Sequence, residues 1–250
     1  MALVESESLV LKTYNLADAD KIVVFLTHDH GVVRGVAKGV KRLKSRFGSG
    51  LEPFSIVRAT YYQRESAELV SIQNIEIVNS YFAAAGNPDF LQKFSYLSEL
   101  VITFSPPHDP NETLYRMAKA CLETAAADIE SLTGIVVYFE LWLLRLSGYL
   151  PDWTACVQCG RAISHAEVVS VASNFHLICG NCRRSGGSNR IDATHREIFA
   201  SARRLSPVDF VRTTFEKKSH LKELSNILRR LISQSVGREV TGEISLAVNN

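Results

Sequence analysis

The chain has 250 residues, of which 46% are hydrophobic and 22% are charged, which is ordinary for a globular protein that can bury a sizeable core. Its net charge of +2 is too small to indicate a nucleic-acid partner by itself, and its five cysteines are too few for a disulfide scaffold. The charge is unevenly distributed, with net values of +1, −4 and +5 in residues 1–80, 81–150 and 151–250.

No part of the sequence indicates export or membrane insertion. The first ten residues, MALVESESLV, contain two glutamates and lack the basic and apolar regions of a secretory signal. The most apolar stretch, residues 135–146, carries Glu140 and Arg145, and it is shorter than the roughly twenty apolar residues that a membrane span needs. We therefore expect a cytoplasmic protein with no membrane partner.

The first eighty residues favour β-structure. Stretches rich in Val, Ile, Leu and Tyr alternate with turn-forming residues. The expected strands are Ser8–Leu16, Lys21–Thr27, Gly31–Val40, Phe54–Arg64 and Ala67–Val78. Five short strands in a segment of this length predict a small closed sheet, such as the five-stranded Greek-key barrel of the oligonucleotide-binding (OB) type. An SH3-like barrel also fits the number of strands.

A basic segment joins the third and fourth expected strands. The run GVAKGVKRLKSRFGSGLEPF, residues 35–54, follows Arg34, and no acidic residue lies between Asp29 and Glu52. Like charges repel one another unless an anion binds them, so the segment is a candidate DNA-binding surface. Its cations are Arg34, Lys38, Lys41, Arg42, Lys44 and Arg46.

Aromatic residues accompany these cations. Phe47, Tyr61 and Tyr62 are candidate platforms for the stacking of bases, whereas Phe54 is the better candidate for the core. A cationic groove with aromatic platforms is the usual design for binding single-stranded nucleic acid without sequence preference.

Helices are expected after Tyr81. Asn87 and Pro88 are typical of a helix start, as N-cap and first helical residue. The apolar residues that follow share one helical face: Phe90, Phe94, Leu97, Val101 and Phe104. After a break at 105–112, a second helix places its apolar face at Leu114, Met117, Cys121 and Ala125. Residues 135–146 are apolar on nearly all sides and predict a buried central helix that ends at Gly148.

Four cysteines form two C-x-x-C pairs. Cys156 and Cys159 lie in CVQCG, and Cys179 and Cys182 lie in CGNC. This spacing is typical of a zinc site in which two tight turns direct four thiolates at one ion, with a ribbon of strands between them. No spare histidine or carboxylate is evident, so one structural zinc ion is favoured over a catalytic metal. The alternatives are redox dithiols and buried thiols without a metal.

The C-terminal part contains a second basic cluster and two expected helices. Arg183, Arg184 and Arg190 form a weaker DNA-binding candidate beside the second cysteine pair. The pattern 194–197, Thr-His-Arg-Glu, predicts a capping box and a helix that reaches about Arg204. A last helix carries Leu221, Leu224, Leu228 and Leu231 and stops near Gly237. Its charges, like Arg203 and Arg204, are expected to be mostly solvated.

No pattern in the sequence argues for catalysis. The run GVAKGVKR lacks the Gly-Lys-Ser/Thr ending of a phosphate loop, and no G-x-S-x-G motif is present. Residues 28–31, His-Asp-His-Gly, fit a polar turn better than a metal site because no third ligand is placed. We therefore expect a protein that is not an enzyme.

Four stretches, taken in chain order, resemble the bacterial RecO family of recombination mediator proteins. They are GVAKGVKRLKSRFGSGLEPF, LRLSGYLPD, CVQCG with CGNC, and LRRLISQSVGRE. The resemblance covers nearly the whole chain. It implies an OB barrel, a helical domain and, in many members, a four-cysteine zinc module. By position, it assigns the family's basic barrel segment to Lys38, Lys41, Arg42, Lys44 and Arg46, and the zinc ligands to Cys156, Cys159, Cys179 and Cys182.

The resemblance also implies a function. RecO-like proteins bind single- and double-stranded DNA and anneal complementary strands. With RecR they help to load RecA onto DNA coated by single-stranded DNA-binding protein, whose C-terminal tail they also bind. None of these steps needs nucleotide hydrolysis. The expected protein is thus a mediator of DNA repair and homologous recombination that acts in the cytoplasm, at the nucleoid.

The expected fold is α+β and multidomain. Residues 1–80 form the OB-fold DNA-binding barrel and 81–155 the first part of a helical domain; 156–190 form the zinc module, inserted before the C-terminal helical part, 191–250. Two other functions remain open. One is a zinc-ribbon factor in transcription or assembly that binds protein and has no direct contact with DNA. The other is a metal-dependent nuclease, which needs a carboxylate cluster that the sequence does not show.

Overall fold

The computed structural model describes residues 2–16, 18–42, 45–63, 68–183 and 190–241. Contacts divide the chain into two compact units, Met1–Ile129 with Val240–Asn250, and Glu130–Glu239. The first two long helices thus belong to the same unit as the barrel, and the four-part division expected from the sequence stays a proposal about functional modules. None of the helices in the described ranges combines the length and apolarity that a membrane crossing requires.

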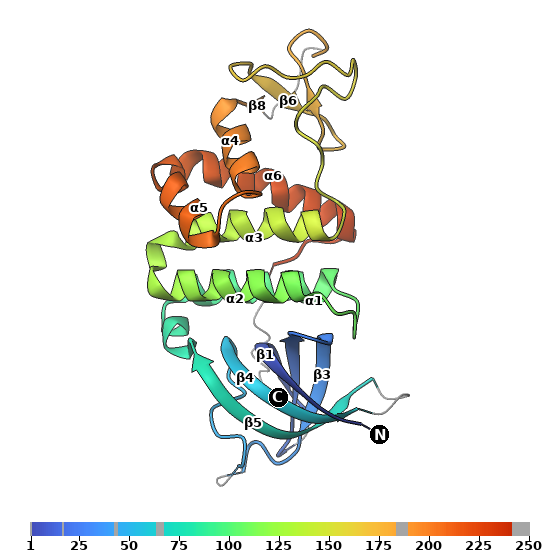
Figure 1. Ribbon diagram of the computed structural model, residues 1–250, viewed down its shortest axis with the longest axis vertical. Coiled ribbons are helices and arrows are strands. Elements are labelled where there is room, and N and C mark those ends of the chain that lie inside the picture. Colours follow the sequence, from blue (N-terminus) through green and yellow to red (C-terminus); the bar gives the residue numbers. More distant parts are fainter. Residues whose placement is uncertain (1, 17, 43–44, 64–67, 184–189, 242–250) are drawn as a thin grey trace. The chain divides into compact units, whose positions relative to one another are not determined.

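The first unit is built on a closed five-stranded barrel (Figure 1). Its strands are β1 (Ala2–Asn15), β2 (Lys21–Thr27), β3 (Gly31–Ala37), β4 (Ser55–Gln63) and β5 (Val70–Ser80). They follow the order β1-β2-β3-β5-β4, and β1 pairs with both β2 and β4. The first half of β1 pairs with β4 and its second half with β2. A bulge between Val10 and Lys12 lies where β1 passes from one partner to the other. The OB-type prediction is confirmed over the SH3-like alternative.

The barrel closes where β3 runs parallel to β5, with Gly35 opposite Val70. A Cβ atom at Gly35 would lie 2.7 Å from the side chain of Ile72 and 2.9 Å from that of Val70. Glycine is therefore needed here because the two strands approach too closely for a side chain.

Two helices cover the barrel in this unit: α1 (Pro88–Phe104), with Asn87 as its N-cap, and α2 (Glu112–Ala127). The one-turn helix η1 (Phe82–Gly86) precedes them. Phe54 packs edge-on against Phe90 and Phe94, whose rings stack on each other at 4.4 Å. The helix start and all the predicted apolar positions of α2 are confirmed, and on α1 Phe104 alone of the five is only partly buried.

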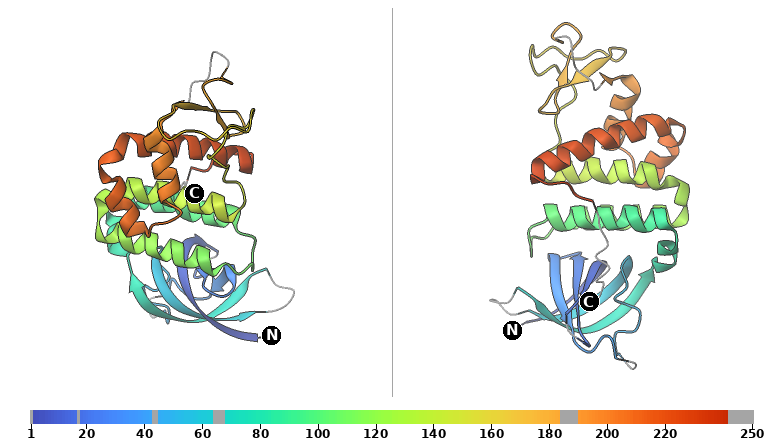
Figure 2. Two further views of the ribbon diagram at one scale, coloured as in Figure 1. Left: turned by 45° about the horizontal axis from the view of Figure 1, so that its top comes forward. Right: turned by 180° about the vertical axis from the view of Figure 1, so that it is seen from behind.

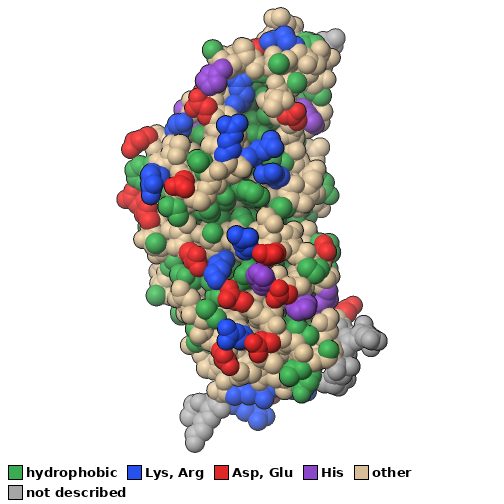
Figure 3. Space-filling model, in the orientation of Figure 1, with side chains coloured by type: hydrophobic (Ala, Val, Ile, Leu, Met, Phe, Trp, Pro, Cys, Tyr) green, Lys and Arg blue, Asp and Glu red, His purple; other side chains and the backbone are tan. Residues whose placement is uncertain are grey.

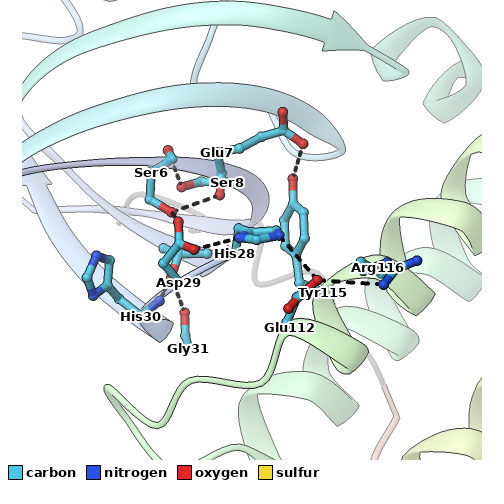
Figure 4. Close-up of polar contacts among 11 residues, drawn as sticks. Ser6, Glu7, Ser8, His28, Asp29, His30, Gly31, Glu112, Tyr115 and Arg116 are labelled. Atoms are coloured by element: carbon cyan, nitrogen blue, oxygen red, sulfur yellow. Dashed lines mark hydrogen bonds and ion pairs between the residues drawn. The ribbon is translucent and has the colours of Figure 1, made fainter.

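A polar network joins α2 to β1 and to the turn after β2 (Figure 4). The Tyr115 hydroxyl donates to Oε1 of Glu7 at 2.8 Å, and Asp29 accepts from Ser6 Oγ at 3.1 Å. His28 lies between Asp29 and Glu112, at 2.6 and 3.8 Å. Residues 28–31 thus form a turn that helps to fix α2 on the barrel, and the preference for a polar turn over a metal site agrees with this arrangement.

The second unit is centred on α3 (Leu132–Leu146), along which α6 (Lys218–Val236) packs (Figure 2). The one-turn helices η2 (Ile129–Ser131) and η3 (Phe215–Lys217) precede them. Shorter helices α4 (Ala193–Ser201) and α5 (Pro207–Thr214) complete the unit. As expected, α3 is buried on nearly all sides, and α6 ends at Gly237, which adopts a left-handed conformation with φ 75°.

Two expectations for this unit are wrong. The N-cap of α4 is Asp192, whose carboxylate accepts from the His195 amide, so the capping box at 194–197 does not form. The same helix stops at Ser201, and a separate helix, α5, begins at Pro207 with Ser206 as its cap.

The cysteine pairs lie in a small ribbon of three strands: β6 (Val169–Val171), β7 (Leu177–Ile178) and β8 (Arg190–Ile191), in the order β7-β6-β8. Trp153 attaches this ribbon to the helices, because its Nε1 donates to the Phe175 carbonyl at 2.9 Å and its ring stacks on Phe199 at 4.3 Å.

Candidate nucleic-acid interface and metal site

The basic segment between β3 and β4 is fixed by apolar side chains that enter the barrel. Phe47 and Leu51 are each 2% exposed and belong to the barrel core. The backbone is held at its other side, since Gly39 donates to the Asp20 carboxylate at 2.7 Å and Lys41 to the Ala19 carbonyl at 3.0 Å. The segment is therefore an anchored cover of the barrel and not an extended hairpin.

This anchoring leaves the predicted cations on the surface. Arg34, Lys38, Lys41, Arg42 and Arg46 are all exposed. The Arg46 guanidinium lies over the Phe47 ring and donates to the Ile72 carbonyl at 3.4 Å. In the described parts of the chain, Arg34, Lys38 and Arg42 form no ion pair. The sixth predicted cation, Lys44, lies outside the described residues.

Several other charged side chains of the barrel have ion-pair partners. Arg58 on β4 pairs with Glu5 and Glu76, at 3.6 and 3.7 Å. On the face drawn in Figure 3, acidic and basic side chains alternate over this part of the molecule. The basic segment thus differs in its unmixed charge from the part of the barrel surface around Arg58.

The expected stacking platforms are mostly absent. Phe47 is buried in the barrel core, and Tyr61 is fully buried, with a pKa that burial raises to about 12. Tyr62 is half-buried and is the candidate that keeps some exposure. The prediction of stacking is wrong for Phe47 and Tyr61, because both side chains point toward the barrel interior, whereas the assignment of Phe54 to the core is confirmed.

The ribbon brings the four predicted cysteines together. Their sulfur atoms all lie within 4.8 Å of one another, and Sγ of Cys159 is 3.9 Å from Sγ of Cys179. A tetrahedral site with metal–sulfur bonds of about 2.3 Å has sulfur–sulfur edges of about 3.8 Å, whereas a disulfide needs about 2.05 Å. The spacing thus fits a metal ion and excludes a disulfide between these two residues. Cys121 lies apart, fully buried in α2, as expected for a core residue.

Hydrogen bonds within the cluster shift the pKa values of the cysteine thiols. The Cys179 amide donates to Sγ of Cys156 at 3.4 Å and lowers the pKa of that thiol to about 6. Hydrogen bonds to the neighbouring sulfurs, first of all to Cys159, raise the pKa of Cys182 to about 12. Four thiols this close cannot all ionise unless a cation balances their charge. The donor set and its electrostatics therefore suit a bound metal ion.

A salt bridge braces the ribbon. Arg161 donates to both carboxylate oxygens of Glu167, at 2.7 and 2.9 Å, and the Gly180 amide donates to the same group at 3.0 Å. These contacts connect the two cysteine turns. Of the predicted arginine cluster, Arg183 and Arg190 are exposed at the second turn and on β8, and Arg184 lies outside the described residues.

A second basic surface, which the sequence reasoning missed, lies in the helical unit. Four arginines line a groove of about 750 Å³: Arg145, Arg196, Arg203 and Arg204. Asp152 is the acidic residue among the described residues that line it, and Trp153 and Phe199 contribute apolar walls. Nη1 of Arg196 is buried and has no hydrogen-bond partner within the described chain. On the face drawn in Figure 3, Lys and Arg side chains gather over the region of α4.

Two side chains of α3 position this groove. Nε1 of Trp142 donates to the Ala202 carbonyl at 2.8 Å, and the Tyr138 hydroxyl donates to the Leu205 carbonyl at 3.0 Å. They hold the connection between α4 and α5 against α3, so Arg203 and Arg204 lie near Arg145. The expectation that Arg203 and Arg204 are mostly solvated is incomplete, because both residues line this groove.

Comparison with known proteins agrees with these features. The N-terminal model of recombination protein O matches residues 1–81, and its C-terminal model matches residues 94–242. The DNA repair protein RecO of Koribacter versatilis is 33% identical over 187 residues, which cover 73% of each chain. That of Geobacter metallireducens is 31% identical over 188 residues, covering 75% of this chain and 76% of its own. That of Bifidobacterium animalis subsp. lactis is 35% identical over 162 residues, which cover 64% of this chain and 67% of its own.

The N-terminal model thus covers the barrel, and the C-terminal model covers the helices from α2 onward and the four-cysteine ribbon. Together the two models span nearly the whole chain. The chain therefore belongs to the RecO family of DNA repair proteins.

Proposed function

We propose that this protein is a non-catalytic mediator of DNA repair that binds single- and double-stranded DNA and anneals complementary strands. In the cell it acts with RecR to load RecA onto DNA coated by single-stranded DNA-binding protein, whose C-terminal tail it contacts, in the cytoplasm at the nucleoid. The observation that carries the DNA-binding part is the unmixed positive charge of the segment from Lys38 to Arg46, held on an OB barrel. Family membership supports the remainder.

Binding is proposed to rest on phosphates. Cations that meet phosphates release condensed counterions, which makes affinity fall steeply with salt. Because Phe47 and Tyr61 are buried, base stacking contributes little, and the interaction is expected to tolerate both single and double strands. Sequence preference is not expected, since phosphate contacts carry no base information.

Annealing is proposed to use both basic surfaces. The barrel segment belongs to one compact unit, and the arginine groove belongs to the other. A protein that holds a strand on each surface raises the local concentration of one strand around the other, which speeds pairing without any covalent step.

The four cysteines are proposed to hold one zinc ion with a structural role. Cys156, Cys159, Cys179 and Cys182 supply all four positions of a tetrahedral site, so no position remains for water or substrate. The ion contributes folding free energy to a ribbon whose three strands are only two or three residues long.

The proposal is tested by titrating a labelled, unstructured single strand with the full chain across a salt series. One triple variant replaces Lys38, Lys41 and Arg42 with alanine, and a second replaces Arg145, Arg203 and Arg204. The control replaces three exposed cations that lie outside both surfaces, Arg212, Lys222 and Arg230. Each phosphate contact on a single strand contributes about 0.7 to the log–log salt slope, so each test variant is expected to flatten the slope by up to about 2.

The control is expected to leave the slope within experimental error of the wild type. A barrel variant with unchanged affinity and slope would remove DNA binding by this segment. If instead the wild type fails to bind even at low salt, the zinc-ribbon interaction factor is favoured. Cleavage of the strand that depends on added divalent ions would instead favour the nuclease.

A further inference from the structure

A second group of metal-ligating side chains lies where α4 meets α6. Nδ1 of His195 is 2.9 Å from Oδ1 of Asp192, and Nε2 of His220 is 3.3 Å from Oδ2 of the same carboxylate. One ligand atom of each residue lies within 4.8 Å of a ligand atom of the other two. Three donors, from the N-cap of α4, from α4 and from α6, thus converge on one small volume.

The burial of His195 makes this convergence informative. Its side chain is 3% exposed, and its Nε2 has no hydrogen bond in the part of the chain that the structure describes. Oε2 of Glu223 lies 3.3 Å from that nitrogen, so one imidazole stands between two carboxylates. A neutral imidazole has one N–H and can serve one carboxylate, which leaves the other facing a bare nitrogen. Both carboxylates are compensated when the imidazole binds one cation, either a proton or a metal ion.

His220 favours the metal over the proton. Its ring centroid is 4.8 Å from that of His195. A proton on His195 involves only one of the two rings, whereas a single transition-metal ion takes both neutral imidazoles as ligands and accounts for their convergence on Asp192.

We propose that Asp192, His195 and His220 form a second metal site, which binds a divalent transition-metal ion of the Zn²⁺ type separately from the four cysteines. Nδ1 of His195, Nε2 of His220 and a carboxylate oxygen of Asp192 are the ligands. When the ion occupies Nδ1, the proton of His195 resides on Nε2, which lies 3.3 Å from Oε2 of Glu223. A carboxylate behind a ligating histidine is the usual outer support of a zinc site. Two histidines, one carboxylate and an open position are a common donor set for Zn²⁺.

The location gives this site a structural consequence. Asp192 directly follows β8, which pairs with β6 of the cysteine ribbon, and it is also the N-cap of α4. His220 lies in the first turn of α6. An ion at this point joins the end of the ribbon and the start of α4 to α6, so it stabilises the connection between the ribbon and the helices of the same unit.

The test is the stoichiometry of Co²⁺ and Zn²⁺ bound to the full chain after its metals have been removed. Co²⁺ bound to thiolates gives an intense sulfur-to-metal charge-transfer band, whereas Co²⁺ on nitrogen and oxygen ligands gives only weaker ligand-field bands. Wild type is expected to bind two equivalents, one of each kind. Asp192→Asn keeps the N-cap, since asparagine caps helices as well as aspartate, and His220→Gln alters a partly exposed side chain.

Both variants are expected to lose the second equivalent, with at least a tenfold weaker affinity, and to retain the thiolate equivalent, which shows that the ribbon is folded. His30→Gln, a histidine of the barrel turn, is the control and should bind two equivalents. Zn²⁺ added beyond the first equivalent should raise the Tm of the wild type and leave that of Asp192→Asn unchanged. One equivalent in the wild type, or two in both test variants, would overturn the proposal.

Discussion

A single carboxylate on β1 shows how one residue fixes α2 on the barrel. Oε1 of Glu7 lies 2.7 Å from Nζ of Lys119 and 2.8 Å from the Tyr115 hydroxyl. The contact with Lys119, supported by Tyr115, lowers the pKa of Glu7 below its ordinary value of 4.5. The ionised form is therefore favoured by folding, and the stability of the unit depends on pH.

Glu7→Gln is predicted to flatten the acid limb of the stability curve. The pKa of Glu7 is lower in the folded chain, so its contribution is fully present above about pH 4.5 and is lost as the pH falls through the folded value. Urea denaturation between pH 3 and pH 7 measures this. Glu76→Gln, at an exposed carboxylate of β5, is the control. An acid limb that stays as steep in Glu7→Gln as in the wild type would contradict the assignment.

At the scale of elements, the pairing of α3 with α6 includes an ion pair whose carboxylate is buried. Glu140 is fully buried, its Oε2 accepts from Ser225 Oγ at 3.0 Å, and its Oε1 lies 3.4 Å from Nε of Arg229. A buried carboxylate that loses its cation keeps the cost of desolvation without the compensating attraction. The half-exposed guanidinium therefore contributes more than its position on the surface suggests.

Arg229→Ala is predicted to lower the free energy of unfolding by about 2–3 kcal/mol, somewhat less than the loss of a fully buried pair because Ser225 remains. Arg230→Ala, at the next residue of the same helix, removes an exposed cation and should cost less than about 0.5 kcal/mol. Chemical denaturation compares the two. Adding Glu140→Gln to Arg229→Ala should recover part of the loss, and equal costs for Arg229→Ala and Arg230→Ala would contradict the pairing.

Elements with strong local signals were predictable from the sequence. The bounds of β2, the start of α1 and the end of α3 follow from periodicity and from Asn87 and Gly148. The helix α5 was missed because it has eight residues, too few for a clear period. The cap of α4 was misplaced because Asp192 and Thr194 are both good caps, and the end of β8 at Ile191 decides between them.

The same contrast applies to the candidate site. The cysteine cluster was predictable because its spacing is local. The arginine groove was not, since Arg145 and Arg203 are far apart in sequence and meet only through the hydrogen bonds of Trp142 and Tyr138. Phe47 was misjudged because it lies in a segment without a period, where burial depends on the closure of the barrel.

At the scale of the molecule, the basic segment of the barrel belongs to one compact unit, and the arginine groove and the cysteine ribbon belong to the other. This separation implies that the proposed metal site and the barrel can be perturbed independently. The ribbon has little core of its own, and its attachment to the helices includes the contacts of Trp153 with Phe175 and Phe199. Loss of the proposed zinc ion should therefore release the ribbon while the barrel stays folded.

Cys159→Ser is predicted to loosen the ribbon without unfolding the barrel. The residue is exposed, so the substitution removes one ligand with little change in packing. In a Trp142→Phe background, Trp153 is the remaining tryptophan, and its emission should shift to the red as it loses the stacked Phe199. Hydrogen exchange should rise in residues 155–183 and stay unchanged in β1–β5. Cys121→Ser, at the cysteine buried in α2, is the comparison that should leave the ribbon protected. If the ribbon keeps its protection in Cys159→Ser, packing against Trp153 and the Arg161–Glu167 bridge suffices to hold it, and the structural role proposed for the metal is lost.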